Sequence, residues 1–239
     1  MNELFKDPKT FLFAILGGVV PAIFWLWFWL KEEDEEHNEP TGLIALSFIL
    51  GGITVLIAIA LEKFTLPYFP DPTYKLIIWA AIEEIVKLVA VTLIISRLGI
   101  IKKPIDYPMY FIAVALGFAA FENVLYVLQP LSVSNTVVGL LTGNLRFLGS
   151  TLLHAIASAM IGSALGISFF IKEYRGLYLF VGCMCAVVLH SIFNFFIMNG
   201  SGENFLSVFG FLWVVAIISI LIFEKLKRMG NYVVPATHQ

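Results

Sequence analysis

The chain has 239 residues, of which 59% are hydrophobic and 13% are charged, and its formal net charge is −2. Soluble globular domains average roughly 45–50% apolar and about 25% charged residues, so this composition excludes them. It also excludes a disordered chain, while two cysteines are too few for a disulfide-stabilised secreted fold and the negative charge argues against nucleic acid as a partner. An integral membrane protein remains.

The apolar segments predict the fold class. A spanning helix needs roughly 20 apolar residues. In chain order the sequence predicts seven spans, at about Phe11–Leu30, Gly42–Leu61, Lys75–Ser96, Met109–Leu128, Leu145–Ile171, Leu177–Met198 and Phe205–Phe223. We therefore expect an all-α, polytopic transmembrane helical bundle. Residues 1–239 are predicted to form one membrane domain, with a motif core at about 75–198 and a cytoplasmic tail at about 224–239.

The fifth predicted span carries a row of small residues. Ser158, Gly162 and Gly166 recur every four residues. Such a row lets a neighbouring helix approach closely in a membrane. We expect a tight helix–helix contact along it.

Basic residues between the spans indicate the orientation of the chain. One side receives nine Lys and Arg residues and the other receives five; the nine are Lys31, Arg97, Lys102, Lys103, Lys172, Arg175, Lys225, Lys227 and Arg228, and the five are Lys6, Lys9, Lys63, Lys75 and Arg146. The richer side is expected to be cytoplasmic. This predicts a multi-pass protein of the cell membrane with a cytoplasmic C-terminus.

Four consecutive spans contain polar residues that are costly in hydrocarbon. Buried charges there cost several kcal/mol unless they are paired or hydrated, so each one is a functional candidate. The third span holds Glu83, Glu84 and Lys87, the fourth Glu122 and Asn123, the fifth His154 with Arg146 near its start, and the sixth His190 and Asn194.

These polar residues are predicted to share one layer of the membrane. At 1.5 Å per residue, Glu83 lies ~12 Å and His154 ~13 Å from the entry ends of their spans. Glu122 lies ~9 Å and His190 ~12 Å from the exit ends of theirs. Successive spans alternate in direction, so all four ends belong to one membrane face. Four helices therefore contribute to a single catalytic layer.

Helical spacing predicts which of these side chains act together. Glu83 and Glu84 both lie within reach of Lys87, at spacings of four and three residues. They point about 100° apart, so we expect one to face the reaction centre and the other to neutralise Lys87. His190 and Asn194 are four apart and project together, as needed to hold a metal or to donate to an oxyanion.

The charge of the layer leaves the cofactor open. If all three glutamates are ionised, Lys87 leaves a net charge of −2, which protonation or a divalent cation would relieve. Glu122, His154 and His190 would suit zinc with an open position for water. Each residue also has a structural interpretation. Glu84 and Lys87 could simply fix helix packing, and each histidine could bridge two helices. We expect either zinc or no metal.

Four motifs in this order resemble the PrsW family of bacterial intramembrane proteases, which is related to the CAAX prenyl proteases and the ABI superfamily. They are E-E-x-x-K at Glu83 to Lys87, F-x-x-x-E-N at Phe118 to Asn123, His154, and H-x-x-x-N at His190 to Asn194. The resemblance covers about residues 75–198, and it implies that the membrane is a bacterial plasma membrane. It implies peptide-bond hydrolysis, with first-step cleavage of a membrane-bound anti-sigma factor on its extracytoplasmic side.

The resemblance also implies roles for the residues. Glu83 would activate water, Glu122 and His154 would orient it, and His190 with Asn194 would hold the oxyanion. Beyond the resemblance, we expect Glu84 and Lys87 to form a supporting pair, and we expect Asn123 and Arg146 to be further supporting residues. CAAX-type relatives carry histidine where this chain has Glu122, so their farnesylated substrates are not transferred. The resemblance leaves a zinc enzyme and a metal-free glutamate protease as alternatives.

Two other functions explain polar residues in mid-membrane. A proton- or ion-coupled transporter would use the same Glu/His cluster, but it needs a polar path to both faces, and little polar material lies deeper in these spans. A non-catalytic membrane scaffold would keep the polar cluster only as a relic and would bind its partners without using it. We expect a membrane-protein or peptide substrate, the lipid bilayer and no nucleic acid as the partners of the chain.

Overall fold

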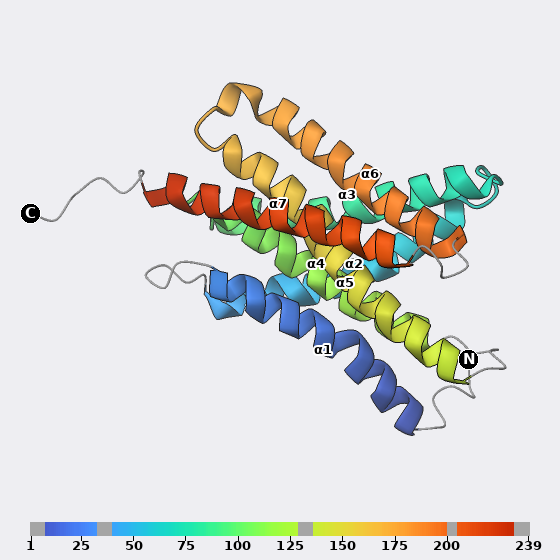
Figure 1. Ribbon diagram of the computed structural model, residues 1–239. Helices are drawn as coiled ribbons and strands as arrows, with labels where there is room; N and C mark the ends of the chain where they lie inside the picture. The colour runs from blue at the N-terminus through green and yellow to red at the C-terminus, as the bar shows by residue number, and fades with distance from the viewer. Residues whose placement is uncertain (1–7, 33–39, 129–135, 200–204, 232–239) are drawn as a thin grey trace, which may run out of the picture.

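The computed structural model describes residues 8–32, 40–128, 136–199 and 205–231, and in these ranges every regular element is a helix (Figure 1). The elements are α1 (Pro8–Glu32), α2 (Thr41–Thr65), α3 (Pro72–Leu98), α4 (Asp106–Leu128), α5 (Thr136–Ile167), the short 3-10 helix η2 (Lys172–Tyr174), α6 (Arg175–Asn199) and α7 (Phe205–Asn231). The predicted all-α bundle is confirmed.

The seven predicted spans correspond to the seven α-helices. Five of these, α2, α4, α5, α6 and α7, are long and apolar enough to cross a membrane. The apolar stretch described in α1 is shorter, at Ile15–Lys31, and α3 carries charged residues in its middle. The predicted fifth span is displaced, because α5 ends at Ile167 and η2 follows at Lys172.

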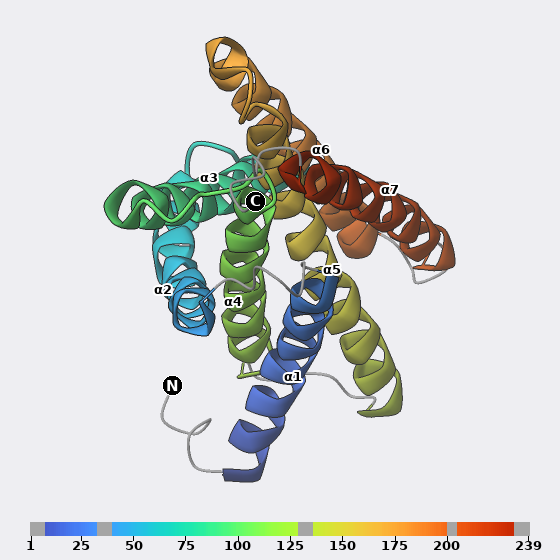
Figure 2. The ribbon, with the colours of Figure 1, turned by 90° about the vertical axis from the view of Figure 1, so that its left-hand side faces the viewer.

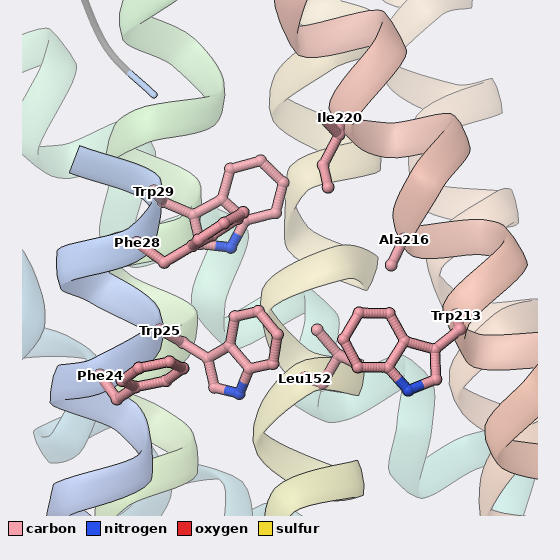
Figure 3. A pocket seen from close by; sticks show the side chains of 8 residues that line it. All are labelled: Phe24, Trp25, Phe28, Trp29, Leu152, Trp213, Ala216 and Ile220. Carbon is pink, nitrogen blue, oxygen red and sulfur yellow. The ribbon is translucent and has the colours of Figure 1, made fainter. Parts of the chain in front are cut away.

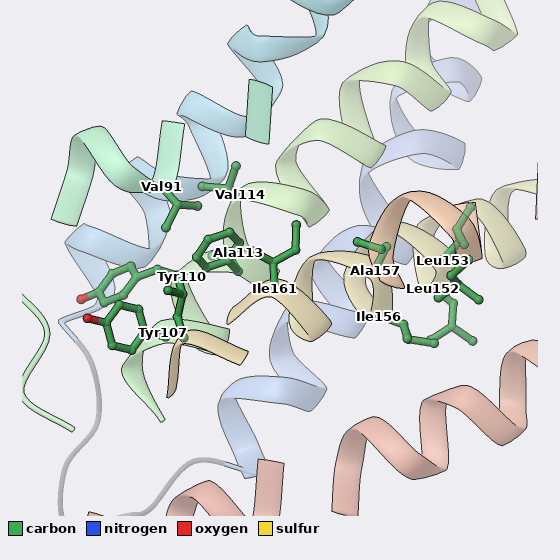
Figure 4. Packing of buried hydrophobic residues seen from close by; sticks show 14 of the residues in the cluster. Val91, Tyr107, Tyr110, Ala113, Val114, Leu152, Leu153, Ile156, Ala157 and Ile161 are labelled. Atoms are coloured by element: carbon green, nitrogen blue, oxygen red, sulfur yellow. The ribbon is translucent and has the colours of Figure 1, made fainter. Parts of the chain in front are cut away.

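Helix α4 lies at the centre of the bundle. It packs against α1, α2, α3 and α5, and Figure 2 shows it between α2 on one side and α1 and α5 on the other. All its residues from Asp106 to Ala120 are buried. Tyr110, Val114 and their neighbours pack against Val91 of α3 and Ile161 of α5 (Figure 4). This enclosure from Asp106 to Ala120 gives the bundle a fixed central element.

Glycines let the helices approach this centre closely. A Cβ atom added to Gly117 of α4 would overlap the carbonyl oxygen of Phe48, and one added to Gly51 of α2 would overlap that of Val114. A Cβ on Gly162 of α5 would lie 2.5 Å from Cα of Pro108. This confirms the tight contact predicted along the small-residue row of α5.

Local sequence fixes where α3 begins and ends, and so where its charged residues lie. The Asp71 carboxylate accepts hydrogen bonds from the backbone N–H groups of Thr73 and Tyr74, at 2.8 and 3.2 Å, and Pro72 occupies the first helical position. Gly99 ends the helix in the left-handed conformation, at φ +60°. The charged residues of α3 are therefore held about three turns inside the bundle.

Candidate active site

Polar side chains from four helices meet inside the bundle, at the level that their positions along the helices predict. Glu83, Glu84 and Lys87 come from α3, Glu122 from α4, His154 from α5 and His190 from α6. The helices involved pack against one another in the pairs α3–α6, α4–α5, α5–α6 and α3–α5. All of these side chains except that of Glu122 are buried.

A buried ion pair forms the base of the cluster. The Lys87 ammonium donates to Oε1 of Glu84 at 2.6 Å, and the two side chains are 0% and 1% exposed. Ser158 of α5 donates to the other carboxylate oxygen of Glu84 at 3.3 Å. The ammonium also lies 4.9 Å from the centre of the Phe118 ring. Glu84 thus joins α3 to α5 through full use of its acceptors.

The contacts of His154 determine its tautomer. Lys87 Nζ lies 3.0 Å from Nδ1 of His154, and an ammonium can only donate, so Nδ1 accepts. The proton of the neutral imidazole is then on Nε2, which lies 3.0 Å from Oε2 of Glu122. Glu122 is 39% exposed. A hydrogen-bonded chain therefore runs from the buried ammonium, through His154, to a carboxylate at the edge of the site.

His190 is held in a similar way. Its Nδ1 lies 2.8 Å from Oε1 of Glu84, which is a carboxylate acceptor, so Nδ1 donates. The other ring nitrogen, Nε2, faces Oε2 of Glu83 at 3.7 Å. The rings of His154 and His190 stand nearly perpendicular, with their centroids 4.9 Å apart. In its neutral form His190 therefore presents a lone pair to Glu83.

Three acceptor atoms converge on one small space. Oε2 of Glu83 is buried and has no hydrogen-bond partner among the described residues. It lies 3.7 Å from Nε2 of His190 and 3.9 Å from Nδ1 of His154. The lone pair of His154 Nδ1 is engaged by Lys87, so Oε2 of Glu83 and Nε2 of His190 are the two acceptors between which a water molecule or a cation can bind.

The two glutamates of α3 divide their roles as their 100° separation predicts: Glu84 pairs with Lys87, and Glu83 faces the space between the two imidazoles. Their contacts with His190 add a detail that the spacing does not predict. In the structure Glu84 reaches Nδ1 of His190, and Glu83 faces Nε2 of the same ring. The imidazole of α6 lies between the two directions, so both carboxylates address it.

The donor set fits a divalent ion. One ligand atom each from Glu83, His154 and His190 lie within 4.8 Å of one another. This set contains Glu83 in place of the predicted Glu122, which contacts the far nitrogen of His154. A carboxylate on the far nitrogen of each histidine is typical of metal sites. Lys87 would have to release Nδ1 of His154 for an ion to bind all three.

The remaining predicted residues lie around this cluster. Asn123 is buried and donates to Oγ1 of Thr151 at 3.1 Å, which links α4 to α5. Asn194 is half-buried, one turn after His190 on α6. Arg146 belongs to α5, but its side chain is outside the described residues.

Sequence reasoning missed one carboxylate. Glu62 is half-buried near the end of α2 and lies close enough to interact electrostatically with Glu122 and Glu83. It follows the buried residues Val55 and Ala58 at helical spacing, which places it on the inner face of α2. This spacing could have identified Glu62 as facing the bundle. It was overlooked because a charged residue at the end of a span usually lies at the membrane surface.

Comparison with known proteins gives a consistent result. The family described as "PrsW family intramembrane metalloprotease" matches residues 39–222. The Protease PrsW of Shouchella clausii is 24% identical over 223 residues, which cover 92% of this chain and 98% of the relative. Those of Geobacillus kaustophilus and Clostridioides difficile are 28% and 26% identical, over 77% of this chain and 79% and 78% of theirs. No solved structure matches the chain significantly.

Proposed function

The chain belongs to the PrsW family of intramembrane proteases, and from this premise we propose that it is an endopeptidase that hydrolyses a peptide bond of a membrane-bound substrate at the Glu83 cluster. The observation that carries this proposal is the buried Oε2 of Glu83, which has no hydrogen-bond partner in the described part of the chain and faces Nε2 of His190 at 3.7 Å. A water molecule between these two atoms would donate a hydrogen bond to each. That arrangement holds and activates a nucleophile.

The proposed reaction is general-base hydrolysis. As the water oxygen bonds to the carbonyl carbon of the substrate, its proton passes to Glu83. The carbon–nitrogen bond of the tetrahedral intermediate then breaks, and Glu83 returns the proton to the leaving amine. A positioned carboxylate of this kind contributes roughly 10²–10⁴-fold to a rate.

The surrounding residues take supporting roles in this proposal. Glu122 and His154 act as positioning residues: contacts on both nitrogens fix the imidazole of His154 beside Glu83, so it shapes the water site without binding the water. Neutral His190 accepts from the water at Nε2 while its Nδ1 donates to Glu84, and Asn194, one turn further along α6, supplies an amide donor to the oxyanion. Lys87 keeps Glu84 ionised.

A divalent ion is compatible with the same residues. Glu83, His154 and His190 would hold it. When bound, such an ion polarises a carbonyl and lowers the pKa of a coordinated water. The family name includes the word metalloprotease, and Zn²⁺ binding is therefore part of the tests below.

We further propose the substrate class and the orientation. The substrate is an anti-sigma factor-like single-span protein, cut in a first step near the extracytoplasmic face. The excess of Lys and Arg on the opposite side supports a cytoplasmic C-terminus. The cluster then lies in the half of the bundle nearer the extracytoplasmic face.

The test is proteolysis by the purified protein in liposomes, with a panel of single-span substrates that includes anti-sigma factors, and with products identified by mass spectrometry. We expect cleavage that falls about 10²–10⁴-fold in Glu83→Gln. Glu224→Gln, which alters an exposed ion pair with Arg228, is the matched control. Undiminished cleavage by both Glu83→Gln and His190→Ala would overturn the assignment. Ion flux in the same liposomes without cleavage would favour the transporter.

A further inference from the structure

An apolar pocket lies between α1, α5 and α7, away from the polar cluster. Its volume is about 230 Å³, and it is lined by four aromatic residues of α1, three residues of α7 and Leu152 of α5 (Figure 3). Leu152 is two residues before His154, which turns it about 200° around α5. The pocket and the candidate active site are therefore on opposite sides of one helix.

The pocket contains hydrogen-bond donors without acceptors. The indole nitrogens of Trp25 and Trp29 are buried and have no hydrogen-bond partner among the described residues. Trp29 is 1% exposed, and Figure 3 shows its nitrogen on the ring edge turned toward Trp25. Indole donates and cannot accept, and the other lining side chains are those of Phe, Leu, Ala, Ile and Trp. Among the described residues that line the pocket, none supplies an acceptor for these two N–H groups.

The position of the donors indicates where an acceptor is found. Trp29 is three residues before the end of α1 at Glu32, or about 4.5 Å along the axis. The sequence from Lys31 to Glu36 is charged, so α1 ends at the membrane surface. The donors thus lie just below the headgroups, at the depth where Trp is enriched and where acyl chains begin.

The pocket is accessible from the bilayer. Phe24 and Trp213, on its rim, are exposed, whereas Trp29, Leu152 and Ala216 are buried. The rings of Trp25 and Trp213 contact each other at one end of it, with their centroids 6.1 Å apart and their planes at 55°. A ligand that enters from the side therefore comes from the lipid, and it fills a gap between α1 and α7.

We propose that this pocket binds one acyl chain of a bilayer glycerophospholipid, whose ester carbonyl accepts a hydrogen bond from the indole N–H of Trp29. Trp25 offers a second donor, one turn deeper. The bound chain packs against Leu152 and ties α1 to α5, the helix that carries His154. This site is independent of the proteolytic reaction.

The test is native mass spectrometry of the delipidated full-length protein, titrated with palmitoyl-oleoyl phosphatidylglycerol. We expect one tightly bound lipid per chain. Ala216→Phe fills the pocket and is expected to weaken binding at least tenfold. Trp29→Phe keeps an aromatic ring, although a smaller one, and removes the donor. It is expected to weaken binding about fivefold, the factor for one hydrogen bond.

Matched variants and a matched lipid keep the result interpretable. Ile217→Phe, next to Ala216, and Trp27→Phe, on α1, change exposed residues outside the pocket and are expected to bind lipid normally. The diether analogue lacks ester carbonyls and is expected to bind wild type as weakly as the ester lipid binds Trp29→Phe. Equal binding by Ala216→Phe and Ile217→Phe would overturn the site. If Ala216→Phe does not fold, equal binding by Trp29→Phe and Trp27→Phe overturns it.

Discussion

Replacing Lys87 by Met is expected to destabilise the bundle strongly. The Lys87–Glu84 pair is 0% and 1% exposed, so the change leaves a carboxylate in the core without its cation. Removal of one partner of a buried pair costs about 3–5 kcal/mol. Nδ1 of His154 also loses its donor, at a cost of about 1–3 kcal/mol, but Glu84 keeps its contacts with His190 and Ser158. We therefore expect a total loss of about 3–5 kcal/mol.

The assay is reversible unfolding by sodium dodecyl sulfate in mixed micelles. The double variant Lys87→Met/Glu84→Gln removes the orphaned charge, so we expect it to be more stable than Lys87→Met alone. Arg228→Met breaks an exposed pair with Glu224 and should change stability by less than about 1 kcal/mol. The reasoning is refuted if Lys87→Met costs less than about 1 kcal/mol, or if the double variant is as unstable as the single one.

Three further predictions follow from the same geometry. Glu122→Gln replaces the accessible carboxylate that contacts His154, so we expect the rate of proteolysis to fall about 10–100-fold while the unfolding transition stays unchanged. A variant that also loses stability would contradict this prediction. Gly117→Leu places a side chain against the backbone of Phe48, so the backbones of α2 and α4 must separate. We expect the free energy of unfolding to fall by about 3 kcal/mol or more. Wild-type stability would show that the two helices are not in tight contact there. In equilibrium dialysis with Zn²⁺, we expect one binding site per chain. Glu122→Gln should lower the affinity for Zn²⁺ about 10–100-fold, and Glu83→Gln should lower it further. Identical affinities in the wild type and these two variants would refute the ligand set.

The sequence predicts the bundle because its signals are local. Long apolar runs mark helices, and Asp71-Pro72 and Gly99 mark the ends of α3. The shared depth of Glu83, His154 and His190 follows from helix rise alone. These quantities depend on one helix at a time.

The details that the sequence could not supply depend on how helices are rotated about their axes. The joint approach of Glu83 and Glu84 to His190 requires α6 to lie between their directions. Glu62 reaches the site because α2 turns that face inward, which its position at the end of a span conceals. Composition alone also fails to identify α3 as a span, because its charged residues Glu83, Glu84 and Lys87 lie in the middle of the helix, where they are buried by the other helices.

The enclosure of α4 also affects how the protein is made. Helices α4 and α5 are less apolar than α2 and α7, and most of their surface is covered by neighbours. A newly synthesised α4 therefore gains less from lipid than the outer helices do, and its glycine-lined contacts are available only after α2 is in place. We expect the translocon to retain α4 until α5 emerges, so that the two helices leave for the bilayer together.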